Sequence, residues 1–272
     1  MLKISRILKS FFIGVFLAGL VFYPDSSFAV NQDLVERLDR SADVFQNLMK
    51  AGDQGIPQDL LKNCEAVAIF PKTFNLAWGI GGQFGRGVAL RHDKVKHDWG
   101  EPAFYTIEGL TLGPQIGGQT IDIVLLVMNE NGLKSLLQSH TTLGGDAGIA
   151  LGPVGRNATV STDLGLQAEI YSYSKAKGLF IGLSLKGAMV APDDAAIADY
   201  YGQNLTAREI LMGGKGAHKK YSQKLLTGLR RYTPGRFPFI VMIFLWMAAL
   251  VGGLFLIGRF LLNRNGRHGD SA

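Results

Sequence analysis

The polar segment 91–100 (RHDKVKHDWG) is where the sequence comes closest to a metal site. His92-Asp93 and His97-Asp98 place two imidazole–carboxylate pairs close together, and these groups bind divalent metals. No further ligand cluster in the sequence accompanies them, so we favour a solvated turn between two strands. We therefore expect neither a metal nor a cofactor.

Other catalytic patterns are weak. The glycines from Gly79 to Gly87 match neither G-x-G-x-x-G nor G-x-x-x-x-G-K-[ST], and strand curvature explains Gly85-Arg86-Gly87 better. No G-x-S-x-G nucleophile elbow is present. Asp122, Asp146 and Asp163 are spread along predicted strands, with nothing in the sequence to pair them for acid–base work. We expect a protein that is not an enzyme.

Basic residues beside apolar or aromatic ones are candidates for binding lipid headgroups. In YSYSKAKGLF, Tyr171 and Tyr173 alternate before Lys175 and Lys177 and could place their rings at an interface. A charged turn between strands explains the same composition equally well. Arg86 and Lys72 are weaker candidates. The strongest physical case is a basic group near the C-terminus, made up of Lys215, Lys219, Lys220, Lys224, Arg230 and Arg231.

The charge is divided unevenly along the chain. Residues 30–213 contain 15 Lys or Arg and 20 Asp or Glu, whereas residues 214–272 contain 10 Lys or Arg and one Asp. Basic charge concentrated beside an apolar stretch indicates anionic headgroups, each nearby cation contributing about 1 kcal/mol. The globular part lacks a basic stripe interleaved with aromatics, so nucleic-acid binding is not expected.

The two ends of the chain predict export and anchoring. Residues 1–29 have a basic start, a short apolar run and a small-residue end, the layout of a secretory signal cleaved after Ala29. An uncleaved N-terminal anchor is the alternative. Residues 237–258 carry no charge, and as a helix they would rise about 33 Å, enough to cross a bilayer. Glycines there would also allow self-association of that helix.

The middle of the chain predicts an α+β fold. Residues 32–50 have the apolar spacing of an amphipathic helix. From Ala66 onward, short β-prone runs alternate with glycines, and glycine makes up 35 of 272 residues. This pattern predicts a glycine-rich, mostly antiparallel curved sheet or partly closed barrel with flanking helices. Thr206 and Glu209 predict a capping box.

From about residue 33 to residue 213, the sequence resembles the SYLF domain family. The resemblance is carried by CEAVAIFP at 64–71, GIGGQFGRGVAL at 79–90, WGEPAFYTIEGLTLGPQIGGQTIDIVLLVMN at 99–129, LGGDAGIALGPVGR at 143–156 and IYSYSKAKGLFIGLSLKGA at 170–188. In the family the second of these segments forms a glycine-rich hairpin, and the positions of Lys175 and Lys177 are commonly basic. The resemblance implies binding to acidic phospholipid without catalysis.

The sequence thus predicts five parts: a signal peptide (1–29), a SYLF-like lipid-binding domain (30–213), a basic juxtamembrane segment (214–236), a transmembrane helix (237–258) and a short basic tail (259–272). The expected function is that of a membrane-anchored, non-enzymatic protein that binds anionic phospholipid in envelope organisation or membrane tethering. The expected location is the cell membrane, with the domain on the periplasmic side. The alternative is a carrier or enzyme that encloses an apolar ligand in the curved sheet.

Overall fold

The computed structural model describes residues 30–52, 55–154, 168–216, 220–234 and 246–247. The first described element is helix α2 (Gln32–Met49), which begins where the Asn31 side chain accepts a hydrogen bond from the Asp33 N–H at 3.1 Å. Its apolar face, including Leu38 and Phe45, is buried. The predicted amphipathic helix over 32–50 is confirmed.

Two very long strands form the centre of the sheet. Strand β1 (Ala66–Asp93) pairs antiparallel with β3 (Ala103–Val127) from Ala66↔Val127 to Ala89↔Ala103. The connection between them contains the short strand β2 (Asp98–Trp99). We call the paired β1 and β3 the ribbon. Its register shifts between Phe70 and Thr73 and again between Trp78 and Gly79.

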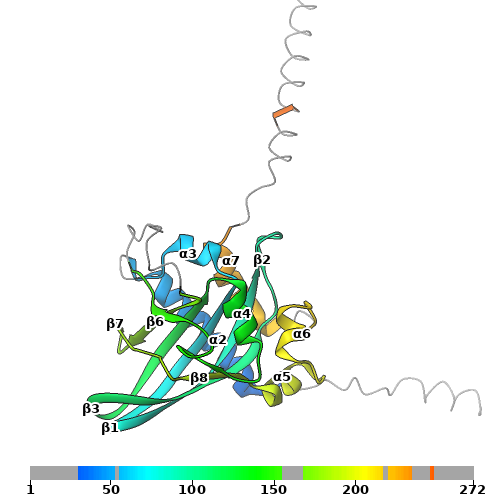
Figure 1. The fold of residues 1–272 in the computed structure, drawn as a ribbon. Helices are drawn as coiled ribbons and strands as arrows, with labels where there is room; N and C mark the ends of the chain where they lie inside the picture. The colour runs from blue at the N-terminus through cyan, green and yellow to red at the C-terminus, as the bar shows by residue number, and fades with distance from the viewer. Residues whose placement is uncertain (1–29, 53–54, 155–167, 217–219, 235–245, 248–272) are drawn as a thin grey trace, which may run out of the picture.

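The ribbon bends back on itself in the middle, at the lower left of Figure 1. The His92 N–H donates to the Glu65 carbonyl at 2.8 Å, so the two ends of β1 lie side by side. Glycine makes this approach possible, because a Cβ on Gly87 would lie 2.1 Å from the Ile69 carbonyl oxygen. Strand curvature at Gly85 and Gly87 is therefore confirmed. The expectation of a hairpin over 79–90 was wrong, since these residues belong to one bent strand.

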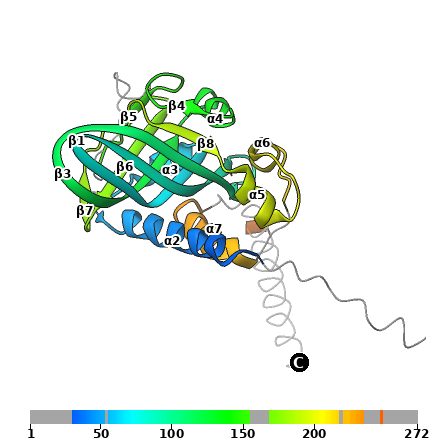
Figure 2. The same ribbon diagram turned by 90° about the horizontal axis from the view of Figure 1, so that it is seen from below.

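Shorter strands extend the ribbon into a sheet that curves as a half-barrel (Figures 1 and 2). On one side, β3 pairs with β6 (Ile170–Ala176), which also pairs with β7 (Leu179–Ile181) and, in parallel, with β5 (Ile149–Leu151). On the other side, β3 pairs with β8 (Met189–Pro192), which pairs with β4 (Thr141–Thr142). The sheet is mixed, because the β5–β6 pair is parallel.

Helices cover both faces and one end of the sheet. Besides α2, the described helices are α3 (Gln58–Asn63), α4 (Glu130–Leu136), α5 (Asp194–Tyr201), α6 (Ala207–Leu211), the 3-10 turn η2 (Lys220–Ser222) and α7 (Gln223–Tyr232). Figure 2 shows α2 and α7 together on one side of the sheet, with α4 and β4 on the other. The capping box of Thr206 and Glu209 is present as predicted.

The core joins the sheet to these helices. The Tyr105 hydroxyl donates to the Leu136 carbonyl at 3.0 Å, and the Tyr201 hydroxyl donates to the Pro102 carbonyl at 2.7 Å. The Phe104 and Tyr200 rings lie 5.0 Å apart. Cys64 is fully buried, and burial raises the pKa of its thiol to about 12.

The predicted fold class included a transmembrane helix, and this part of the prediction is corrected. Among the residues that the structure describes, no helix is both long enough and apolar enough to cross a membrane. The predicted signal over 1–29 lies outside the described residues, as does the predicted span over 237–258 apart from Trp246 and Met247. The fold class is α+β, a curved mixed sheet in the form of a half-barrel with helices.

Candidate functional site

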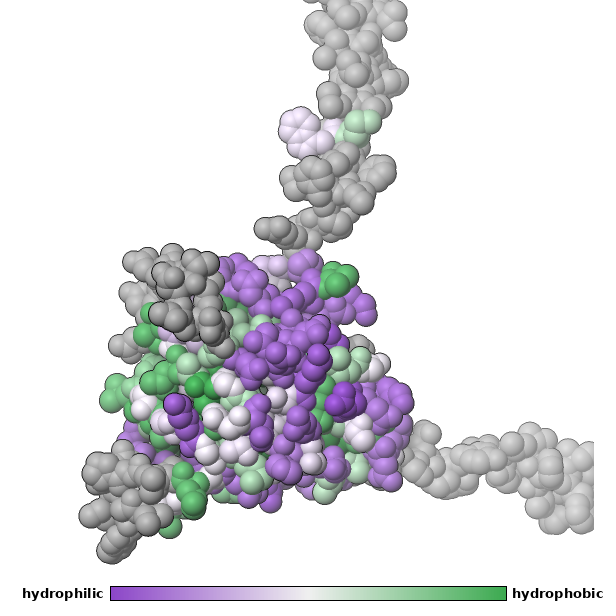
Figure 3. Space-filling view, in the orientation of Figure 1, coloured by the Kyte–Doolittle hydropathy of each residue, from purple (hydrophilic) through white to green (hydrophobic). Residues whose placement is uncertain are grey.

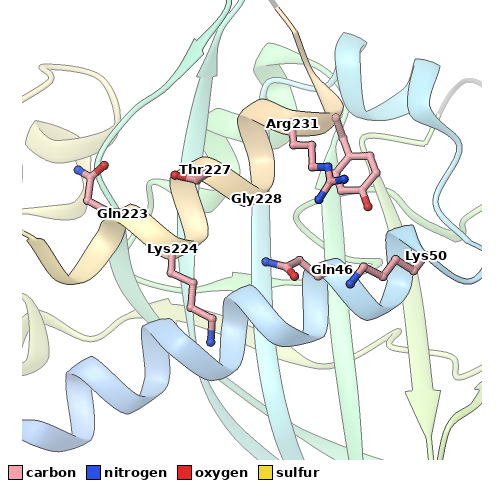
Figure 4. Close-up of a pocket in the computed structure, with 8 residues that line it drawn as sticks. Gln46, Lys50, Gln223, Lys224, Thr227, Gly228 and Arg231 are labelled. Carbon is pink, nitrogen blue, oxygen red and sulfur yellow. The ribbon is translucent and has the colours of Figure 1, made fainter.

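A groove of about 340 Å³ runs between α2 and α7 (Figure 4). The helices lie together because the apolar face of α7, including Leu225 and Leu229, is buried and the Phe45 and Tyr232 rings meet edge to face at 5.9 Å. Its lining residues are Gln46, Lys50, Gln223, Lys224, Thr227, Gly228, Arg231 and Tyr232. We call this site the α2–α7 groove.

The three cations of the α2–α7 groove differ in their partners. Lys224 lies 2.9 Å from the Asp43 carboxylate and 3.8 Å from that of Asp39, and the hydrogen bond with Asp43 raises the pKa of Lys224. Within the described residues, no carboxylate lies within ion-pair distance of Lys50 or Arg231. Figure 4 shows Arg231 extending from α7 towards the end of α2 that carries Lys50. The groove therefore presents positive charge that the described side chains leave unneutralised.

The rest of the predicted basic group is divided between structural pairs and the surface. Arg230 binds the Asp98 carboxylate through Nε at 2.6 Å and Nη2 at 3.1 Å. Lys215 lies 2.8 Å from Glu209, and this hydrogen bond is the main cause that lowers the pKa of Glu209 to about 2. Lys220 is exposed on η2, and Lys219 lies outside the described residues.

The tyrosines of β6 do not lie at an interface. Tyr171 and Tyr173 are each 3% exposed, and the Tyr173 hydroxyl donates to the Pro153 carbonyl at 3.0 Å. Burial raises the pKa of both phenols. The sequence suggested that these rings could reach a surface. The structure corrects this expectation, because both faces of β6 are buried. Alternation along a strand does not reveal that both faces are buried.

The lysines that follow are closer to the surface. Lys175 is half-buried, with its Nζ 5.7 Å from the centre of the Phe180 ring. Lys177 is exposed in the turn before β7, with a left-handed φ of 47°. The neighbouring Leu179 is 71% exposed, and Figure 3 shows hydrophobic surface over β6 and β7 on the left of the view. The charged turn expected there is present.

Lys72 and Arg86 come together although the sequence separates them. They line a cleft of about 260 Å³ at the start of α2, together with Asp33, Arg37, Arg40, Pro71, Phe74, Phe84 and Gly85. Arg86 lies 3.8 Å from Asp33, while Arg37 lies 3.4 Å from Asp33 and 3.0 Å from Asp193. Sequence reasoning missed Arg37, Arg40 and Lys50, whose only signal was their place in the amphipathic α2 pattern.

The histidine segment forms a turn, and one of its histidines is internal. His92 is 3% exposed and stacks on Trp99 with ring centres 4.6 Å apart. The Asp93 carboxylate accepts hydrogen bonds from the Val95 and Lys96 N–H groups, both at 3.0 Å. Where side chains are described, no group of three potential metal ligands gathers.

The geometry of the described sites favours non-covalent recognition of anions. The α2–α7 groove offers guanidinium and ammonium groups on a partly apolar wall, a combination that binds phosphate-bearing headgroups. The concave side of the sheet, where an enclosed apolar ligand was the alternative, holds packed side chains including Tyr105, Ile107 and Leu136.

Comparisons with known proteins agree with the sequence resemblance. Residues 108–232 match the Ysc84 family model, described as "Las17-binding protein actin regulator". "LAS seventeen-binding protein 3" of Saccharomyces cerevisiae is 33% identical over 173 residues, which is 62% of this chain and 37% of the relative. "SH3 domain-containing YSC84-like protein 1" of Xenopus laevis is 29% identical over 163 residues, or 59% and 48% of the two chains. The matched region covers less than half of each relative.

Proposed function

Since the chain contains a domain of the SYLF (Ysc84) family, we propose that it is a non-enzymatic binding protein that recognises acidic phospholipid. The names of these relatives and of the family refer to binding, to an SH3 domain or to actin regulation, and none of them denotes an enzyme. The activity of those longer proteins is not transferred whole, because this chain spans only part of their length.

One observation carries the proposal: Lys50 and Arg231 face one groove without carboxylate partners in the described structure. Both side chains are exposed, so an anionic bilayer can approach them without displacing a protein ion pair. A basic residue at such a surface contributes about 1 kcal/mol of binding energy. Lys224 adds positive charge in the same groove, although Asp43 and Asp39 offset it.

The experiment is co-sedimentation of the full chain with vesicles of phosphatidylcholine, either alone or mixed with phosphatidylglycerol. Binding through cations requires more protein to sediment with the mixed vesicles, and the excess must fall as salt rises and screens the charges. The same full chain, with its apolar residues 237–258, is used with both vesicle types. The difference in sedimentation between the two vesicle types therefore isolates headgroup recognition. Equal sedimentation with the two lipids at low salt would reject the proposal.

We also propose that the domain meets this lipid on the extracytoplasmic, periplasmic side of the membrane. The leader pattern of residues 1–29 supports this location. A membrane-impermeant maleimide applied to intact spheroplasts should label a Val95→Cys variant, because Val95 is 90% exposed. Labelling that appears only after lysis would place the domain in the cytoplasm.

A protein partner with an acidic surface is the second candidate. The observation that favours it is the name of the yeast relative, which refers to binding LAS seventeen. The same cations would serve such a partner. Lipid vesicles free of protein distinguish the two candidates, since only the first predicts charge-dependent binding to lipid alone.

A further inference from the structure

We propose that one uncovered face of the ribbon enters the apolar part of the bilayer while the nearby cations hold headgroups. This ribbon face is defined by Phe74, Leu76, Phe84 and Leu110, which are 50%, 54%, 44% and 77% exposed. The inference rests on the proposed function, because it adds a penetrating element to a protein that recognises acidic lipid.

These four side chains share one face of the ribbon. Phe74 and Phe84 line the same cleft at the start of α2, and Leu76 follows Phe74 by two residues, the period of one strand face. Leu110 stands opposite Gly82, which precedes Phe84 by two residues. Farther from the bend, the same face is covered: Val88 and Phe104 are fully buried, with the Arg37 guanidinium 5.4 Å from the Phe104 ring. The cover ends where the apolar surface begins.

Side-chain character changes in order along this face. Lys72 and Arg86 lie at the edge of α2, Phe74 and Phe84 come next, and Leu76 and Leu110 lie nearest the bend. This order matches the depth profile of a bilayer, in which cations stay with headgroups, aromatic rings sit at the interface and aliphatic chains go deepest. A protein partner would impose no such order, so the gradient favours lipid as the occupant.

The sequence through the bend agrees with this assignment. Residues 77–82 and 109–118 contain no charged residue. One acidic residue on the ribbon face is Glu108, which is exposed and stands opposite Phe84 at the aromatic level. It lies farther from the bend than Leu110, so penetration can stop short of it.

The backbone at Lys72 is specialised to present this residue. Lys72 has a left-handed φ of 50°, unusual for a residue other than glycine. Its N–H donates to the Asp122 carboxylate at 2.9 Å, within the register shift between Phe70 and Thr73. Such irregularities re-aim side chains, and here the result is an exposed lysine between α2 and Phe74.

The ribbon face and the α2–α7 groove can meet one bilayer. Both border α2, because the cleft that Phe74 and Phe84 line includes Asp33 from its first turn, and the groove includes Gln46 and Lys50 near its end. Figure 2 shows α2 and α7 on one side of the sheet. Adsorption through the groove therefore brings the bend towards the same membrane.

The test places an environment-sensitive dye on a Leu110→Cys variant of the full chain. The native Cys64 is fully buried, so the introduced thiol reacts selectively. Val95→Cys is the matched control, because Val95 is 90% exposed in the turn between β1 and β2, at the other end of the ribbon from the bend (Figure 1). Vesicles containing phosphatidylglycerol and a lipid-borne quencher are then added.

The expected result is quenching of the dye at position 110 by the lipid-borne quencher, with at least a two-fold loss of quenching by aqueous iodide, while the dye at position 95 stays open to iodide. Equal shielding at both positions would overturn the inference, because it would reflect general burial. If vesicles bind through phosphatidylglycerol but position 110 stays in water, the inference fails and the proposed function stands. If no charge-dependent binding occurs, both fail.

Discussion

Arg230 and Asp98 form a two-point ion pair, with Nε at 2.6 Å and Nη2 at 3.1 Å from the carboxylate oxygens. The pair ties α7 to β2 across 132 positions of sequence. Arg231, the next residue, has no carboxylate partner among the described residues and lines the α2–α7 groove. Two adjacent arginines thus have different roles, one in the fold and one at the proposed lipid surface.

Neutralising these two arginines should therefore affect different properties, stability for Arg230 and vesicle binding for Arg231. Arg230→Gln is expected to lower the free energy of unfolding by about 1 kcal/mol, since the pair is only partly buried, and to leave vesicle binding nearly unchanged. Arg231→Gln should keep the melting temperature and weaken binding to phosphatidylglycerol vesicles. Calorimetry and co-sedimentation on both variants check the prediction. The reverse assignment would show that Arg231 is structural.

The bend of the ribbon should depend on Gly87. In Gly87→Ala the new Cβ would meet the Ile69 carbonyl oxygen at 2.1 Å, where backbone must move. We expect a loss of more than about 2 kcal/mol of unfolding free energy. Gly82→Ala is the matched control, because its Cβ would find its nearest neighbour at 3.9 Å. Similar denaturant midpoints for the two variants would refute the role of Gly87.

His92 should make the fold sensitive to acid. Burial is the main cause that lowers the pKa of His92, with Lys94 and His97 contributing and Glu65 opposing. The unfolded chain takes up a proton near pH 6.5, while the folded imidazole takes it up only at a lower pH. Stability contributed by His92 is thus present above about pH 6.5 and is lost as pH falls below it.

A His92→Gln variant should therefore show a smaller drop in melting temperature between pH 7 and pH 5 than the parent chain. The carboxylates with lowered pKa values, such as Asp93 and Asp146, titrate below this window in the folded state and are common to both proteins. An unchanged drop in the variant would assign the acid sensitivity to other groups.

Removing the negative charge of Glu108 should strengthen membrane binding. Glu108 is the acidic residue at the aromatic level of the ribbon face, where an anionic bilayer repels it. Glu108→Gln is expected to raise the affinity for phosphatidylglycerol vesicles roughly five-fold, the equivalent of about 1 kcal/mol. Glu130→Gln on α4 provides an exposed control. Equal gains in both variants would show a general charge effect instead.

Local patterns in the sequence predicted local structure well. Helix α2 and the capping box of Thr206 and Glu209 follow from short-range spacing and side-chain chemistry, and both are present. Gly85 and Gly87 indicated strand curvature, which the close approach to Thr73 and Ile69 confirms. The SYLF resemblance extended this local information to the α+β class.

Long-range packing decided what the sequence could not. Tyr171 and Tyr173 read as one exposed face, but coverage of both sides of β6 depends on segments far along the chain. Arg230 and Arg231 look alike in sequence, and only the position of Asp98 separates them. The length of β1 was missed because glycines that usually end a strand here permit a bend within it.

The central claim is that the cations of the α2–α7 groove recognise acidic phospholipid. It is tested most directly by binding of the full chain to phosphatidylglycerol vesicles at low salt, before and after joint charge reversal by Lys50→Glu and Arg231→Glu. Lys134→Glu on α4, whose lysine side chain is 68% exposed, is the control. We predict at least a ten-fold loss of affinity for the double variant and little change for the control. Equal affinities of the double variant and the parent chain would contradict the claim.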